Sequence, residues 1–207
     1  MSKTLLILGA GGHGKVVADC ALACGWEDVA FLDDRYPQLS SIGHWPVIGK
    51  IDFTAIDKTQ YKHLALGVGN NKLRLKWLKQ GVELGFVFPA LLHPSAVVSP
   101  FASVGDGSVV FAKAVINVDA QIGRAVIINT ASVVEHDCVV ADACHISPTA
   151  CMAGEVSLGE YSWLGMGANI IQCITVGSGV IIGAGAVVVA NIADDQTVVG
   201  IPAKPLK

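Results

Sequence analysis

The sequence has few aromatic side chains and no cluster of basic ones. Aromatic residues make up 6% of the 207 positions, and the formal net charge is -3. Proteins that bind nucleic acid usually carry a basic patch, so we expect no nucleic-acid partner. No run of about 18 residues is apolar enough to span a membrane, and the first residues lack a signal-peptide cleavage pattern. We therefore expect a cytoplasmic protein with no membrane span.

Cysteine pairs are also missing. The six cysteines show neither a C-x-x-C pair nor the spacing of zinc ligands, which argues for reduced thiols and against a metal site. They are Cys20, Cys24, Cys138, Cys144, Cys151 and Cys173. Two of them, Cys138 and Cys144, occupy positions that the repeat described next fills with small residues, where a free thiol packs as a small apolar group.

Aliphatic residues are abundant and recur every six positions. Apolar residues make up 52% of the chain. Sixteen successive positions six residues apart, from Val98 to Val188, are all apolar, and the residue two places before each of them is usually small. This period differs from the 3.6 of an α-helix and the 2 of a simple β-strand.

A six-residue period is typical of the hexapeptide parallel β-helix, in which each hexapeptide forms one side of a triangular coil. Three sides make an eighteen-residue coil, so residues 98–188 supply about five coils stacked at roughly 4.8 Å. Small residues are needed because bulky ones at every inward position would overpack the narrow axis. We expect the chain to turn away after residue 188, in a tail that covers the edge of the last coil.

The first 92 residues show a different pattern, that of a Rossmann-like α/β domain. Strands are expected at 3–8, 29–32, 64–68 and 86–88, with helices after the first and third. We therefore predict two domains. Residues 1–92 form the α/β domain with a short parallel sheet, and residues 93–207 form the β-helix and its tail.

The loops of this α/β domain predict a nucleotide site. A glycine loop at 9–14 brings backbone N–H groups to a helix N-terminus, where a diphosphate is favoured. Acidic residues after the second strand lie at the same sheet edge. The candidates are Gly11, Gly12, His13, Asp33, Asp34 and Asn70. A dinucleotide site has similar ingredients, but the domain is too short for two mononucleotide halves. Asn70 and Asn71 could instead cap the next helix.

A polar segment interrupts the bland aliphatic coils at residues 135–138. His136 stands two places after inward Val134, so it should point outward from a corner. An imidazole there can act as general base for acyl transfer, with Asp137 fixing its tautomer. In the alternative interpretation, His136 is a surface residue at a corner and has no catalytic role.

No serine or cysteine accompanies His136 as an activated nucleophile, which favours direct transfer between two bound substrates. A β-helix coil has no deep pocket of its own. We therefore expect the cleft for a long thioester to lie between neighbouring subunits of a symmetric homotrimer.

Five motifs together carry a family resemblance that covers essentially the whole chain. They are Gly-Ala-Gly-Gly-His-Gly at 9–14, Phe-Leu-Asp-Asp at 31–34, Gly-Asn-Asn at 69–71, Glu-His-Asp-Cys at 135–138 and Gly-Ile-Pro-Ala-Lys at 200–204. The chain resembles the sugar O/N-acetyltransferases related to sialic acid O-acetyltransferase. Within them it is most similar to bacterial UDP-4-amino-4,6-dideoxy-sugar N-acetyltransferases of the bacillosamine type.

This resemblance implies a left-handed β-helix, acetyl-CoA as co-substrate, a UDP-amino-sugar as acceptor and His136 as general base. It also implies a set of residues that contact acetyl-CoA, namely His145, Gly154, Met166, Gly167 and Ala184. Asp137 stands where bacillosamine-type members carry Glu, and Ala184 stands where they carry Gly. The alternatives are an O-acetyltransferase that acts on sialic acid or another nucleotide sugar, and a non-catalytic trimer that senses a nucleotide.

Overall fold

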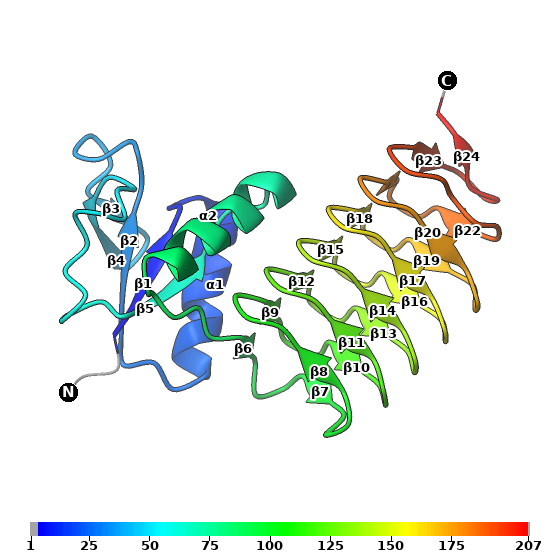
Figure 1. The fold of residues 1–207 in the computed structure, drawn as a ribbon, viewed down its shortest axis with the longest axis horizontal. Coiled ribbons are helices and arrows are strands. Elements are labelled where there is room, and N and C mark those ends of the chain that lie inside the picture. The colour runs from blue at the N-terminus through cyan, green and yellow to red at the C-terminus, as the bar shows by residue number, and fades with distance from the viewer. Residues whose placement is uncertain (1–3, 207) are drawn as a thin grey trace.

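The computed structural model describes residues 4–206, which form two parts placed end to end (Figure 1). A small sheet flanked by two helices comes first, and a long triangular stack of short strands follows. Neither helix in these residues is long and apolar enough to cross a membrane.

The first part contains a five-stranded sheet in the order β3-β4-β2-β1-β5. Its elements are β1 (Thr4–Leu8), α1 (Gly12–Ala23), β2 (Asp28–Leu32), β3 (Ser41–Ile42), β4 (Trp45–Gly49), β5 (His63–Leu66) and α2 (Asn71–Glu83). Strand β1 pairs in parallel with β2 and β5, and β2 pairs in parallel with β4. The short strand β3 runs antiparallel to β4.

Both faces of this sheet are buried. Leu5 and Ile7 of β1 belong to one apolar cluster with Val17 of α1, whereas Leu6 belongs to another with Leu75 of α2. Since successive side chains of a strand point to opposite faces, a strand covered by a helix on each side is apolar throughout. This explains the unbroken apolar run of β1.

The structure adds one hairpin and corrects two local predictions. The hairpin β3–β4 was not predicted, because its strands are short and contain Pro46. The strand predicted at 86–88 is a single bridge between His63 and Val87, although Phe86 and Phe88 are buried in the core beside α2. The strand predicted at 64–68 ends at Leu66.

The second part is a parallel β-helix with three faces. Face 1 contains β7 (Val97–Val98), β10 (Val115–Ile116), β13 (Val133–Val134), β16 (Cys151–Met152), β19 (Asn169–Ile170) and β22 (Val187–Val188). Face 2 contains β8 (Ser103–Val104), β11 (Gln121–Ile122), β14 (Val139–Val140), β17 (Ser157–Leu158) and β20 (Thr175–Val176). Face 3 contains β6 (Leu91–Leu92), β9 (Val109–Val110), β12 (Ile127–Ile128), β15 (His145–Ile146), β18 (Trp163–Leu164), β21 (Ile181–Ile182), β23 (Thr197–Val199) and β24 (Lys204–Pro205).

Each strand pairs with the strand one coil further along, as in the register of Ile116 with Val134. This eighteen-residue register confirms the predicted fold class, an α/β domain followed by a β-helix of hexapeptide repeats. Strands β7 to β21 make up the five expected complete coils (Figure 1). The faces meet at three corners, which we call corner 1–2, corner 2–3 and corner 3–1 after the faces they join.

The corners depend on a backbone feature that the sequence did not reveal. A residue with positive φ recurs every six positions from Gly107 to Gly185, and most of these residues are not glycine. Glycines that directly follow an inward aliphatic residue have a different role. A Cβ at Gly159 would lie 2.5 Å from the carbonyl carbon of Gly177 in the next coil, so the close stacking of coils requires glycine there.

The small inward positions also link successive coils. Cys138 and Cys144 are fully buried, as predicted. The Ser162 hydroxyl, also buried, donates to Gly177 O at 2.8 Å and accepts from Val180 N at 3.0 Å. Serine at such a position therefore satisfies backbone groups that a purely apolar residue would leave without a partner.

The end of the chain differs from the prediction that it turns away after residue 188. Strand β23 pairs in parallel with β21 and extends the β-helix to Val199. The next strand, β24, then pairs antiparallel with β23. The β-helix therefore includes β23, and β24 is the strand that covers its last edge.

The two parts share an apolar junction. Ile127 on face 3 and Phe111, which directly follows β9, belong to the cluster around α1, and Ala125 and Ala143 at corner 2–3 belong to the cluster beside α2. Strand β6 already pairs with β9 of the β-helix. The division into domains at residues 92 and 93 stays a prediction.

Truncation of an inward residue should destabilise the fold. Ile146 is fully buried in the β-helix core, so Ile146→Ala should lower the free energy of unfolding by about 2–5 kcal/mol, through lost burial and the cavity left behind. Urea unfolding measures this change. The control Val82→Ala removes a half-exposed side chain from α2 and should change stability by less than about 0.5 kcal/mol. Equal effects would contradict the inward assignment.

Candidate active site

His136 and Asp137 form a hydrogen-bonded pair at corner 1–2. The His136 Nδ1 atom lies 2.8 Å from Asp137 Oδ2, and both side chains are about half exposed. Asp137 is one of the positive-φ corner residues, with φ 56, a conformation that Asp tolerates better than most residues. The corner thus turns the carboxylate toward the preceding imidazole, which is the predicted arrangement.

The pKa of His136 is raised above its usual value, first by its hydrogen bond to Asp137 and also by the negative charges of Asp137, Glu135 and Glu155. Glu135 itself accepts a hydrogen bond from Asn117 Nδ2 at 2.8 Å. An Nδ1–H that donates to Asp137 leaves the Nε2 lone pair of the neutral ring free to accept a proton.

Gly154 lies one coil beyond His136 and makes room for its ring. A Cβ on Gly154 would lie 2.5 Å from both Cε1 and Nε2 of the imidazole. The imidazole therefore rests against the next coil at a point where only glycine leaves it enough space. The expectation that Gly154 contacts acetyl-CoA stays a prediction.

Five of the six predicted nucleotide residues line a pocket of about 430 Å³ at the carboxyl edge of the sheet, and Asn70 does not. Its lining includes Gly11, Gly12, His13, Asp33, Asp34 and Gly69. Gly12 is the first residue of α1 and Gly11 is its N-cap, so backbone N–H groups at this helix end favour an anion. Asn70 caps α2, since its side chain accepts from Leu73 N at 2.9 Å. This supports the capping interpretation for Asn70.

The two acidic residues of this pocket differ. Asp33 accepts hydrogen bonds from Arg35 Nε at 2.7 Å and Ala10 N at 2.8 Å. The hydrogen bond from Arg35 is the main reason that its pKa is lowered to about 2. Its carboxylate thus holds the glycine loop to the end of β2. The exposed Asp34 has one long hydrogen bond, from Ile51 N at 3.3 Å, and is the carboxylate better placed for a ligand.

Two further histidines, His13 and His145, are partly buried and electrically neutral. Burial, with a smaller contribution from the charge of Arg74, lowers the pKa of His13 to about 4. Burial lowers that of His145 to about 3, and the charges of Arg74 and His13 add to this. The Nε2 atom of His13 is buried and has no hydrogen-bond partner within residues 4–206. The His145 ring stacks on Trp163, with ring centroids 5.8 Å apart. Its Nε2 atom lies 3.1 Å from Asn129 Nδ2.

The structure places the predicted residues in three separate regions. Corner 1–2 carries His136, Asp137 and Gly154, and corner 3–1 carries Met166, Gly167 and Ala184, of which Met166 is 61% exposed. The glycine loop lies in the α/β part, which packs on corner 2–3 and face 3, where His145 also lies. One chain therefore does not bring the predicted catalytic pair to the predicted nucleotide pocket.

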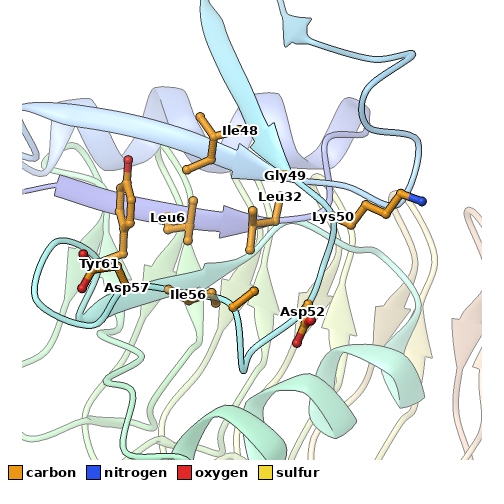
Figure 2. A pocket seen from close by; sticks show the side chains of 10 residues that line it. Leu6, Leu32, Ile48, Gly49, Lys50, Asp52, Ile56, Asp57 and Tyr61 are labelled. Atoms are coloured by element: carbon orange, nitrogen blue, oxygen red, sulfur yellow. The ribbon is translucent and has the colours of Figure 1, made fainter.

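A separate cavity of about 390 Å³ lies beneath the loop that follows β4 (Figure 2). Leu6, Leu32 and Ile48 line it from the sheet, and Ile56 and Tyr61 line it from the loop. This cavity contains none of the predicted site residues.

Comparisons with known proteins agree with this layout. Residues 4–80 match the family model "PglD N-terminal domain", and residues 155–190 match "Bacterial transferase hexapeptide (six repeats)". The acetyltransferase domain of PglB from Neisseria gonorrhoeae FA1090, solved in complex with acetyl coenzyme A, is 46% identical, and the match covers 100% of both chains with a TM-score of 0.95. The chain belongs to the PglD-type sugar acetyltransferase family.

Other family members are also similar over long stretches. PerB from Caulobacter crescentus, solved in complex with CoA and GDP-perosamine, is 38% identical, with 99% of this chain and 97% of that chain covered and a TM-score of 0.94. UDP-N-acetylbacillosamine N-acetyltransferase from Bacillus subtilis is 38% identical over 120 residues, which are 53% of this chain and 52% of that protein. The chain spans about half the length of the curated relatives it matches.

In this family member, Asp137→Asn should lower the pKa of His136, because it removes the negative charge and the acceptor that favour the protonated ring. A pH titration followed by NMR of the imidazole measures the change. The matched control Asp106→Asn changes an exposed acid at corner 2–3 and should leave the pKa of His136 unchanged. A pKa of His136 that does not fall in Asp137→Asn would contradict the pairing.

Proposed function

We propose that this chain is an acetyl-CoA-dependent N-acetyltransferase that acetylates the 4-amino group of a UDP-linked 4-amino-4,6-dideoxy sugar in bacterial glycan biosynthesis. The observation that carries this proposal is the His136–Asp137 pair, 2.8 Å apart on a hexapeptide β-helix that is joined to an α/β domain with a glycine-loop pocket. Relatives matched over about half of their length are named as acetyltransferases of amino sugars linked to UDP or GDP.

The proposed chemistry is direct transfer. The sugar amine attacks the thioester carbonyl, a carbon–nitrogen bond forms, and the carbon–sulfur bond breaks to release the thiol of coenzyme A. His136 Nε2 takes the proton that the amine loses, Asp137 stabilises the resulting imidazolium, and the imidazolium then gives this proton to the departing thiolate. The raised pKa of His136 suits this role, because a more basic imidazole takes up a proton more readily.

The outer surface of the coils suits acetyl-CoA. Met166 and Trp163 are exposed apolar side chains on the upper coils, 61% and 45% exposed, and a long thioester arm can cover such surface. Positive φ at Gly167 and the exposed Ala184 complete corner 3–1. We assign Met166, Gly167, Ala184, Gly154 and His145 to the coenzyme side of the site.

The site is proposed to be shared between subunits of a homotrimer. Corner 1–2, which carries His136, differs from corner 2–3, against which the nucleotide-binding part packs. Cyclic symmetry would bring corner 1–2 of one subunit to the nucleotide pocket of the next. On this view Gly11, Gly12, His13, Asp34 and their neighbours hold the nucleotide sugar of one subunit, and a second subunit supplies the base.

His136→Ala should lower turnover by roughly 10²–10⁴-fold while acetyl-CoA binding is retained, because it removes the general base. Release of coenzyme A thiol, measured with UDP-linked and GDP-linked 4-amino sugars and their 4-hydroxy counterparts, tests this variant and the acceptor together. The control His44→Ala removes an exposed histidine of the α/β part and should keep normal turnover. Normal turnover of folded His136→Ala, or preference for the hydroxy sugar, would contradict the proposal.

Mixing two inactive variants tests the shared site. Gly12→Val should fold, because a Cβ at Gly12 meets nothing within 4 Å, yet should obstruct the nucleotide pocket. In trimers refolded from equal amounts of Gly12→Val and His136→Ala chains, about a quarter of the sites would combine an intact loop with an intact base. We therefore expect turnover to recover to about that fraction. If the mixture were as inactive as each variant alone, the glycine loop and the His136 of one site would belong to the same chain, which would contradict the shared site.

A further inference from the structure

Three successive coils present a backbone carbonyl to the start of α2 at corner 2–3. Ala125 O accepts a hydrogen bond from Arg74 Nε at 2.7 Å, and Ala143 O accepts one from Arg74 Nη2 at 3.0 Å. One coil further, Tyr161 O accepts from Asn71 Nδ2 at 2.8 Å. All three carbonyl residues have positive φ, between 53 and 62. The repeated corner therefore creates a ladder of acceptors, which two side chains of α2 occupy.

Arg74 is buried to an unusual degree for an arginine, with 1% of its surface exposed. Burial lowers its pKa to about 10, so the guanidinium is still charged at neutral pH. Within residues 4–206 it forms no salt bridge, and its acceptors are carbonyl oxygens and the Asn71 side chain. A buried charge requires such hydrogen bonds, and the five donors of a guanidinium can supply them in one plane.

The same guanidinium also holds the nucleotide pocket. Arg74 Nη1 donates to Gly69 O at 3.0 Å, and Gly69 lines the pocket that contains the glycine loop. Arg74 Nη2 donates to Asn71 Oδ1 at 2.9 Å, which fixes the orientation of the Asn71 amide. One pair of side chains therefore links the pocket loop, the first turn of α2 and three coils of the β-helix.

We propose that Asn71 and Arg74 form an alignment clamp that sets the position of the nucleotide pocket relative to the β-helix. They are positioning residues, because they touch the backbone at the pocket and the coils. The inference rests on the proposed function, in which the pocket holds the acceptor and the coils hold the thioester. A misplacement of about 1 Å between reacting groups can lower the rate on the order of 100-fold. Loss of the clamp contacts should therefore lower kcat.

Asn71→Ala and Arg74→Lys test the clamp. Asn71→Ala removes the contact to Tyr161, and Arg74→Lys keeps the charge but loses the planar donors. At saturating concentrations of both substrates, kcat of Asn71→Ala should fall at least about 10-fold, and kcat of Arg74→Lys further. Asn71 is not in the pocket of the glycine loop, so the Kd values of Asn71→Ala for UDP and for coenzyme A, each measured alone by calorimetry, should stay within about threefold of wild type.

Two controls separate alignment from general damage. Arg124→Met removes an exposed arginine at the same corner, which pairs with Asp142 at 2.6 Å, and Lys72→Ala changes the exposed neighbour of Asn71. Both should keep normal kcat. The clamp is overturned if folded Asn71→Ala keeps normal kcat, or if its loss is explained by weaker binding of either ligand.

A structural readout distinguishes failure of the clamp from failure of the proposed function. Hydrogen exchange of the amides at residues 67–74 and 141–145 should be faster in Asn71→Ala than in Lys72→Ala, whether or not a substrate is known. Faster exchange in a protein whose wild type releases no thiol with any amino sugar would support the clamp and refute the function. Unchanged exchange would refute the clamp.

Discussion

The structure depends on the parallel stacking of identical coils in an eighteen-residue register. Each inward residue lies over its equivalent in the next coil, as Val134 lies over Ile116, and the hydrogen bonds between strands fix that spacing. Corner residues are stacked in the same way, so a feature at one corner has defined neighbours above and below it. His136 has room for its ring because Gly154 is the equivalent residue of the next coil, and α2 meets three carbonyls because three equivalent corners carry them.

The environment of each histidine explains how one chain holds imidazoles of opposite character. His136 stands on an exposed corner beside a carboxylate, which raises its pKa. His13 and His145 are partly buried and lie near the positive charge of Arg74, and both effects favour the neutral ring. Of these three rings, His136 is therefore the one whose surroundings favour the protonated form. His13 and His145 stay neutral, so each can donate or accept a hydrogen bond to a bound ligand but does not take up a proton.

The three corners of the triangular section have different tasks. Corner 2–3 is covered by the α/β part and carries the contacts that fix its position. Corners 1–2 and 3–1 remain open in the single chain and carry the proposed catalytic pair and the residues proposed to contact the coenzyme. A flat-sided prism cannot fold two of its corners onto each other, which is the physical reason for proposing a site completed by another subunit.

The sequence by itself determined the β-helix, because a six-residue apolar period is a local pattern that each coil repeats, and it also determined the strand–loop–helix around the glycine loop. It indicated the His136–Asp137 pair, because these residues are adjacent in the chain. Only the tertiary structure decided the role of Arg74, which in a helix resembles any exposed arginine until its acceptors at Ala125 and Ala143 are known. It also decided that Asp33 holds the loop and that β23 continues the β-helix. These features depend on partners more than fifteen residues away, and a pattern along the chain contains no information on which distant groups will meet.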